Sequence, residues 1–149
     1  MSASDLPSRQ RWMRALSHAP LASLAARFEP HLPDSKDTRW LRRAETGLVM
    51  VRGRVGGTGA QFNLGEVSVT RASVALGQHV GHAWVKGGSA RHAELAALAD
   101  ALLQSPAHHK DLMTGVVDPL EAEIAARRDA ESREAAASKV EFFTMVRGE

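Results

Sequence analysis

The stretch LVMVRGRV-GGTG-AQFNLG-EVSVTRASVAL, residues 48–76, decides the fold. Along residues 48–55 the side chains alternate, which predicts a strand with Val49, Val51 and Val55 on one face and Arg52 and Arg54 on the other. The glycine-rich residues 56–59 predict a tight connection, after which the extended pattern resumes at 61–64 and, beyond Gly65, at 66–76. A connection this short joins antiparallel strands.

Further extended segments lie on both sides of this hairpin. Residues 38–44 predict a strand that ends in a turn at residues 45–47, and residues 82–86 predict a last strand after a turn bracketed by Gly77 and Gly81. Within residues 66–76, the valines at 67 and 69 share one face, whereas Val74 and Leu76 share the other. This change of phase around Arg71 predicts a β-bulge or a bend.

Helical periodicity frames the strands. Residues 8–28 predict short amphipathic helices, and residues 89–138 are mainly helical, with Ser89 as a candidate N-cap and Asp118-Pro119 as a second helix start. Residues 108–117 are ambiguous. With a flexible tail at 1–7 and a strand-like segment at 140–147, the sequence predicts one α+β domain over residues 1–149: N-terminal helices, an antiparallel sheet within residues 38–86, C-terminal helices and a terminal strand.

Composition narrows the classes of function. The 149 residues are 44% hydrophobic and 24% charged, which is typical of a globular domain. The absence of cysteine excludes disulfides and thiolate chemistry, and no apolar run approaches the length of a membrane span. No secretory signal is evident, so we expect a cytoplasmic protein. A net charge of +2 with 5% aromatic residues argues against a nucleic-acid-binding domain.

Two glycine-rich loops invite a ligand-binding interpretation. Residues 56–59 lead into a strand, whereas a dinucleotide fingerprint must open a helix, so a hairpin turn is favoured. The other loop, Lys86-Gly87-Gly88-Ser89, precedes a helix whose free amides could hold an anion. A plain strand-to-helix turn capped by Ser89 is the alternative, and it is favoured because every helix start has the same free amides.

The polar residues form no recognisable catalytic or metal-binding set. His79 with His82, and His92 with Glu94, are candidate metal ligands, but no closed set of three or four ligands appears. No serine stands in a nucleophile motif. We therefore predict no catalytic residues, no metal and no cofactor bound by this chain alone.

The carboxy-terminal segment is a candidate docking element. Adjacent side chains of a strand point to opposite faces, so Phe142 and Phe143 cannot both enter one core. Together with Met145 and Arg147 they are residue types that are enriched at interfaces. The alternative is that the preceding helix folds back and covers the second ring. Arg71 is a further candidate for a structural or interface role, since its planar fork suits a carboxylate or freed carbonyls.

Several stretches in order resemble the PhnG family. They are AETGLV (44–49), GGTG (56–59) followed by Phe62 and Gly65, VTRA (69–72), AWV (83–85), HAE (92–94), ADAL (99–102) and FFTMVRG (142–148). The set covers the chain from about Arg11 to Gly148. Each stretch is weak alone, whereas their order is specific.

The resemblance implies an accessory, non-catalytic subunit of the bacterial carbon–phosphorus lyase core complex. Such a subunit is expected to act in the cytoplasm with the H, I and J subunits and the L protein, and not with nucleic acid or membrane. The complex acts on ATP: an alkylphosphonate is attached to C1 of the ribose, and adenine leaves. Two alternatives remain, a stand-alone small-anion or nucleotide-binding module and a basic nucleic-acid-binding domain.

Overall fold

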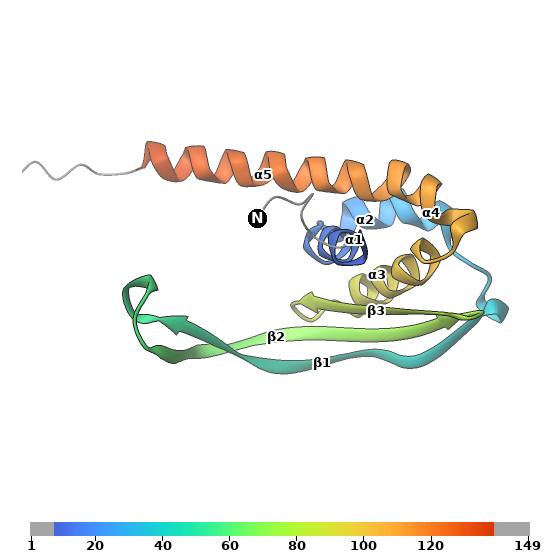
Figure 1. Cartoon of the computed structure of the whole chain (residues 1–149), viewed down its shortest axis with the longest axis horizontal. Helices are drawn as coiled ribbons and strands as arrows, with labels where there is room; N and C mark the ends of the chain where they lie inside the picture. Colours follow the sequence, from blue (N-terminus) through green and yellow to red (C-terminus); the bar gives the residue numbers. More distant parts are fainter. Residues whose placement is uncertain (1–7, 139–149) are drawn as a thin grey trace, which may run out of the picture.

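A computed structural model describes residues 8–138, in which helices cover one face of an antiparallel sheet (Figure 1). Helices α1 (Ser8–His18) and α2 (Leu21–Phe28) precede three strands, and α3 (Ala90–Leu103), α4 (Pro106–Leu112) and α5 (Asp118–Ala137) follow them. This order confirms the predicted α+β class. The predicted tail (1–7) and terminal strand (140–147) lie outside the described residues. Within the described part, no helix has both the length and the apolar character needed to cross a membrane.

The sheet contains β1 (Thr38–Arg54), β2 (Gln61–Leu76) and β3 (His79–Lys86), paired in that order. The predicted glycine-rich connection between β1 and β2 is confirmed: Gly56 and Gly57 have φ values of 60° and 82°, which favour glycine. Strand β3 ends early, because Lys86 pairs with Val69 of β2. Beyond that pair, β1 and β2 continue as a two-stranded arm, residues 47–69, which projects past β3 and past helices α1 to α4 (Figure 1).

The strands are longer than the sequence pattern predicts. The turn predicted at residues 45–47 is wrong: these residues lie inside β1 and pair with residues 69–71, and the hydroxyl oxygens of Thr46 and Thr70 are 2.9 Å apart. Gly65 lies within β2 and Gly81 within β3, so neither interrupts its strand. Cross-strand pairing satisfies the backbone at these positions, and this outweighs the local turn preference.

The β-bulge or bend predicted around Arg71 within residues 66–76 is wrong for β2, which pairs with β3 without interruption from Val69 to Leu76. A bulge opposite Arg71 is present in the neighbouring strand instead. Arg42 pairs with Ser73 and Glu45 with Arg71, so β1 advances by three residues while β2 advances by two. A similar shift separates Trp40 from Arg42. The bulge therefore lies in β1, where it increases the local twist beside Arg71.

Helix α3 is the centre of the core. It packs on β2 and β3 with one side and against α1 and α2 with the other (Figure 1). A Cβ atom at Gly81 of β3 would lie 2.0 Å from the carbonyl oxygen of Ala97. Only glycine therefore lets α3 approach the strand this closely. The predicted cap is confirmed, since the Ser89 hydroxyl accepts a hydrogen bond from the His92 amide at 3.2 Å.

One buried carboxylate joins α1, α3 and β3 within the body, the name used here for the helices together with the three-stranded part of the sheet. Asp100 of α3 is fully buried and accepts hydrogen bonds from Trp12 Nε1 at 2.8 Å, from Arg9 Nη2 at 2.8 Å and from the His82 amide at 2.9 Å. Arg9 also donates to the Val80 carbonyl. The pKa of Arg9 is raised, chiefly by its hydrogen bond to Asp100. These side chains satisfy backbone groups on the open edge of β3 and so block further strand pairing there.

The chain from Pro106 to Ala137 is almost continuously helical, which resolves the ambiguous residues 108–117. Helix α4 leads through a π-helical turn, Met113–Val117, into α5. The prediction that Asp118 is an N-cap is wrong, because Val117 before it is already helical, with φ −67° and ψ −53°. Asp118 instead accepts a hydrogen bond from Arg11 at 2.8 Å. Beyond Ile124 no residue of α5 is buried, and the helix projects toward the same end of the molecule as the arm (Figure 1).

Candidate functional site

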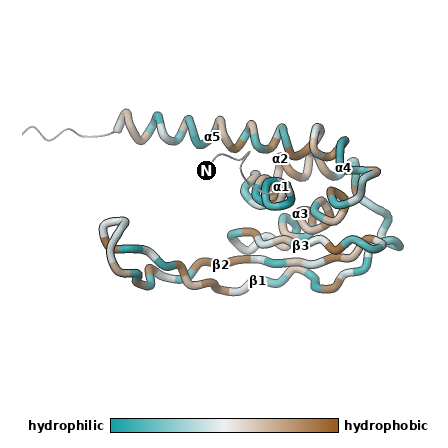
Figure 2. The backbone as a smooth tube through the Cα atoms, in the orientation of Figure 1, coloured by the Kyte–Doolittle hydropathy of each residue, from teal (hydrophilic) through white to brown (hydrophobic). Residues whose placement is uncertain are grey.

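The arm exposes an apolar face that the helices do not cover. The face opposite α3 is called here the outer arm face. Because residues directly opposite each other in a sheet share a face, the register places six apolar side chains on it: Val49, Val51, Phe62, Leu64, Val67 and Val69. Leu64 remains 62% exposed and Phe62 44% exposed. The backbone hydropathy in Figure 2 shows hydrophobic stretches along the arm. Contiguous exposed apolar surface of this kind marks an interaction site.

A hollow of about 340 Å³ lies on this face where β3 ends. It exists because Gly47, opposite Val69, has no side chain, and nothing lies within 4 Å of the position that a Cβ atom would take there. The hollow is lined by Glu45, Thr46, Gly47, Leu48, Val49, Val69, Arg71 and Trp84. Trp84 is 56% exposed, which is unusual for so large an apolar ring.

The charged rim of the hollow consists of Glu45 and Arg71, which line it, and Arg42, which does not line it but binds Glu45. Arg71 Nε donates to Glu45 Oε1 at 2.7 Å, and Arg42 binds the same oxygen. The Arg71 guanidinium also lies 5.6 Å from the centre of the Trp84 ring, within cation–π range. The hydrogen bond from Arg71, followed by that from Arg42, lowers the pKa of Glu45 below its ordinary 4.5. This contact is therefore complete above pH 4.5 and is lost as the pH falls through the lowered pKa.

The structure gives the residues of the predicted anion-binding loop internal partners. The Gly87 amide donates to the Ser68 carbonyl at 2.7 Å, and the Gly87 carbonyl accepts from the Thr70 hydroxyl at 2.6 Å. Ser89 is the cap of α3, while Lys86 is exposed at the end of β3 and Gly88 is exposed beside it. The turn is thus explained by the fold, and anion binding at residues 86–89 stays a prediction.

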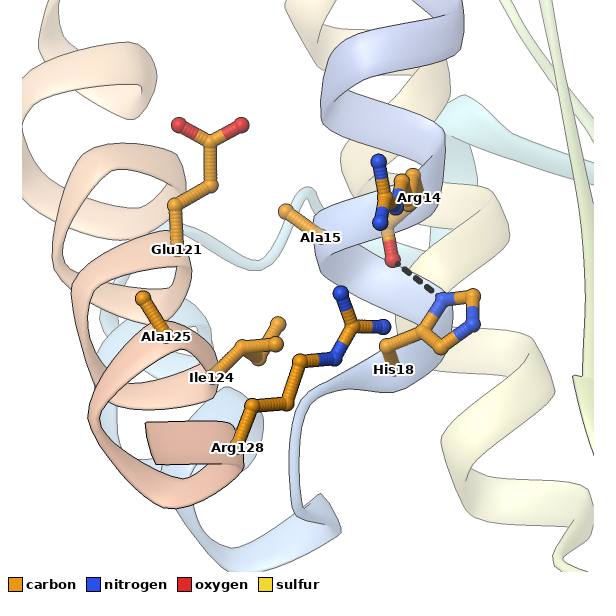
Figure 3. A pocket seen from close by; sticks show the side chains of 7 residues that line it. All are labelled: Arg14, Ala15, His18, Glu121, Ile124, Ala125 and Arg128. Atoms are coloured by element: carbon orange, nitrogen blue, oxygen red, sulfur yellow. Dashed lines mark hydrogen bonds between the residues drawn. The ribbon is translucent and has the colours of Figure 1, made fainter. Parts of the chain in front are cut away.

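A second basic site, which the sequence did not suggest, lies between α1 and α5. A cleft of about 250 Å³ is lined by Arg14, Ala15, His18, Glu121, Ile124, Ala125 and Arg128 (Figure 3). Arg14 and Arg128 have no carboxylate partner among residues 8–138, whereas Glu121 is bound by Arg11 at 2.6 Å. The lining comes from segments about a hundred residues apart, so no local motif could have revealed it.

The candidate metal ligands are separated or already engaged. His92 is buried, with Nε2 2.8 Å from the Leu16 carbonyl oxygen, and Glu94 pairs with Arg43. His82 Nδ1 lies 2.9 Å from the Ser73 hydroxyl. Within the described residues no three His, Asp or Glu side chains are grouped as metal ligands would be. The predicted docking residues Phe142, Phe143, Met145 and Arg147 lie outside residues 8–138, so their role stays a prediction.

Comparison with known proteins supplies the family. Residues 7–148 match the family model described as phosphonate metabolism protein PhnG. A curated relative from Rhizobium meliloti (strain 1021), named alpha-D-ribose 1-methylphosphonate 5-triphosphate synthase subunit PhnG, is 46% identical over 151 residues. That alignment covers 98% of this chain and 93% of the relative. The chain therefore belongs to the PhnG family of phosphonate metabolism proteins, which confirms the resemblance noted in its sequence.

Proposed function

We propose that this chain is an accessory subunit of a ribose 1-methylphosphonate 5-triphosphate synthase in the carbon–phosphorus lyase system. In that role it supports the transfer of an alkylphosphonate to C1 of the ATP ribose, with release of adenine. The proposal rests on a match over nearly the whole chain to a relative that is named as a subunit of this synthase. Its partners are the H, I and J subunits of the core complex, with the L protein, in the bacterial cytoplasm.

The observation that carries the subunit role is the arm. A two-stranded ribbon is marginally stable in water by itself, and this one has six apolar side chains on an uncovered face. A partner that covers this face would bury apolar surface, and each Å² removed from water would stabilise the complex by about 25 cal/mol. The same surface in a lone protein would invite aggregation.

The accessory role is supported by how the polar side chains are used. Asp100 and His92, the buried groups best suited to acid–base work, are held by hydrogen bonds within the body. The rim residues Glu45 and Arg71 bind each other. We expect no catalytic residue, metal or cofactor in this chain, and the assembled complex to act on ATP.

A second candidate function is a small-anion or nucleotide-binding module. The cleft between α1 and α5 favours it, because Arg14 and Arg128 line the cleft from opposite helices (Figure 3). Arginine guanidinium groups suit phosphate and phosphonate oxygens. Calorimetric titration of the isolated chain with ATP and methylphosphonate separates the two functions, since saturable binding by the chain alone supports the module.

The proposal predicts that the chain is inactive alone and binds the other subunits. Purified protein should release no adenine from ATP plus methylphosphonate, whereas a tagged copy co-expressed with the H, I and J subunits should recover them. Adenine release by the isolated chain at a rate near that of the complex would contradict the accessory role. Failure to recover any subunit would contradict membership in the complex.

A copy truncated after Ser138 tests the predicted docking role of the carboxy-terminal segment. We expect weaker recovery of the other subunits, with the melting temperature nearly unchanged.

Replacing Arg71 with lysine should weaken assembly more than it weakens the fold. Lysine carries the charge but lacks the planar fork that meets Glu45 and lies over Trp84. We expect several-fold less partner per tagged chain, with a melting temperature close to that of the parent. Arg52→Lys is the matched control, because Arg52 is an exposed arm residue that pairs with Asn63 and does not line the hollow. Equal assembly of Arg71→Lys and the parent would mean that the fork of Arg71 plays no part in binding the other subunits.

A further inference from the structure

The open edge of the sheet is occupied by side chains in the body but not in the arm. In the body, Arg9 and Gln104 bind the Val80 carbonyl and Asp100 binds the His82 amide, so the edge of β3 is occupied. In the arm, the side of β2 that faces away from β1 has no neighbouring strand beyond Val69, and the described residues place no helix over the outer face. An exposed edge beside an apolar face is a surface that proteins usually cover.

We propose that the hollow above Gly47 is a socket that receives an apolar side chain of another synthase subunit. This inference rests on the proposed function and adds the place and the chemistry of the contact. Gly47, Val49, Val69 and the half-exposed ring of Trp84 are among the residues that line the socket. A hollow of about 340 Å³ admits a leucine, methionine or phenylalanine side chain. Apolar anchors that enter such pockets, beside Trp and Arg, dominate the energetics of protein interfaces.

Charge defines the surroundings of that side chain. Two arginines, Arg42 and Arg71, share the single carboxylate of Glu45, which leaves the rim with an excess positive charge. A partner that places a carboxylate beside its apolar side chain would complement this rim. A second copy of this chain would not, because a symmetric contact through the same face sets the arginine pairs against each other. The occupant is therefore an apolar side chain flanked by acidic residues on a different subunit.

The substitution Gly47→Leu tests the socket. The new side chain would occupy the hollow itself, and nothing within 4 Å obstructs its Cβ atom. Because glycine inside a strand costs stability, the variant should melt at or above the temperature of the parent. We expect at least tenfold less partner to co-purify when the tagged variant is co-expressed with the H, I and J subunits. Gly47→Ser, which leaves most of the hollow open, should retain the partners.

Gly115→Leu is the matched control. Gly115 is exposed in the π-helical turn, has nothing within 4 Å of its Cβ position, and lies in the helical layer, away from the arm. It should assemble like the parent. If the parent and Gly47→Leu recover equal amounts of partner, the socket is refuted while the subunit role stands. If the parent itself recovers none, the proposed function fails first.

Two results on the isolated chain would assign the socket to another occupant and overturn the proposal. One is a homodimer of the parent that Gly47→Leu dissociates, measured by size-exclusion chromatography with light scattering. The other is faster proteolysis of residues 139–149 in Gly47→Leu than in the parent, which would mean that the chain's own end fills the socket. We expect the isolated parent and variant to share one oligomeric state and one cleavage rate.

Discussion

Asp100→Ala is expected to lower the free energy of unfolding by about 3–5 kcal/mol, the range for breaking a buried, hydrogen-bonded charge. The carboxylate is fully buried and accepts from Trp12, Arg9 and the backbone of β3. Alanine would leave the Trp12 and His82 N–H groups buried without acceptors, and each unpaired group costs about 1–3 kcal/mol. For a chain of 149 residues the melting temperature should fall by roughly 10 °C or more.

Two companion variants locate the source of that loss. Arg9→Ala removes the charged partner, but the Arg9 side chain is 43% exposed, so its loss should cost much less than the loss of Asp100. Asp100→Asn keeps the shape and one acceptor oxygen and should fall between the parent and the alanine variant. Urea unfolding at pH 7 measures all three. If Arg9→Ala is as damaging as Asp100→Ala, the ion pair, and not the buried hydrogen bonds, holds α1, α3 and β3 together.

Local patterns predict the elements of this fold and not the contacts between them. Alternation along residues 48–55 and 66–76 and the glycines between them are local properties, and the hairpin follows from them. The Ser89 cap is also local. Asp100, in contrast, lies in an alanine-rich helix, and no neighbouring residue indicates that its carboxylate is buried. Its partner Arg9 lies 91 residues away, and such a distant pairing leaves no periodic trace in a single sequence.

Two of the wrong predictions, the turn at residues 45–47 and the N-cap at Asp118, also come from contacts between segments that are distant in the sequence. Residues 45–47 carry turn-forming residue types, yet pairing with β2 holds them extended. Asp118 and Pro119 form a typical helix start, yet the chain is already helical, and Arg11 from α1 binds the acid. In both places a contact with a distant segment decides the structure.

The projection of the arm is already indicated in the sequence by the unequal lengths of the strands. The predicted last strand, residues 82–86, is much shorter than either strand of the hairpin, and the observed β3 is likewise half the length of β2. A short third strand cannot cover a long hairpin, so part of the hairpin must project. The socket at Gly47 lies where the cover ends, and finding it requires the register of all three strands.

Gly81→Ala should destabilise the body although it adds a single methyl group. The Cβ atom would lie 2.0 Å from the carbonyl oxygen of Ala97 and 2.6 Å from the amide nitrogen of Ala101, both of which belong to the backbone of α3. Neither atom can rotate away, so the helix must shift from β3 and open the core around it. Overpacking of this kind costs typically about 1–3 kcal/mol, and a backbone clash places Gly81→Ala at or above the upper end. Urea unfolding gives the difference.

A double variant distinguishes backbone from side-chain crowding at this contact. Ala101→Gly removes the methyl group that lies 2.8 Å from the new Cβ atom but leaves the Ala97 carbonyl in place. It should therefore fail to rescue Gly81→Ala. Gly88→Ala is the neutral control, because nothing lies within 4 Å of its Cβ position. Full rescue by Ala101→Gly would show that the methyl group sets the spacing between α3 and β3. A parent-like Gly81→Ala would mean that α3 can move away from the sheet at little cost.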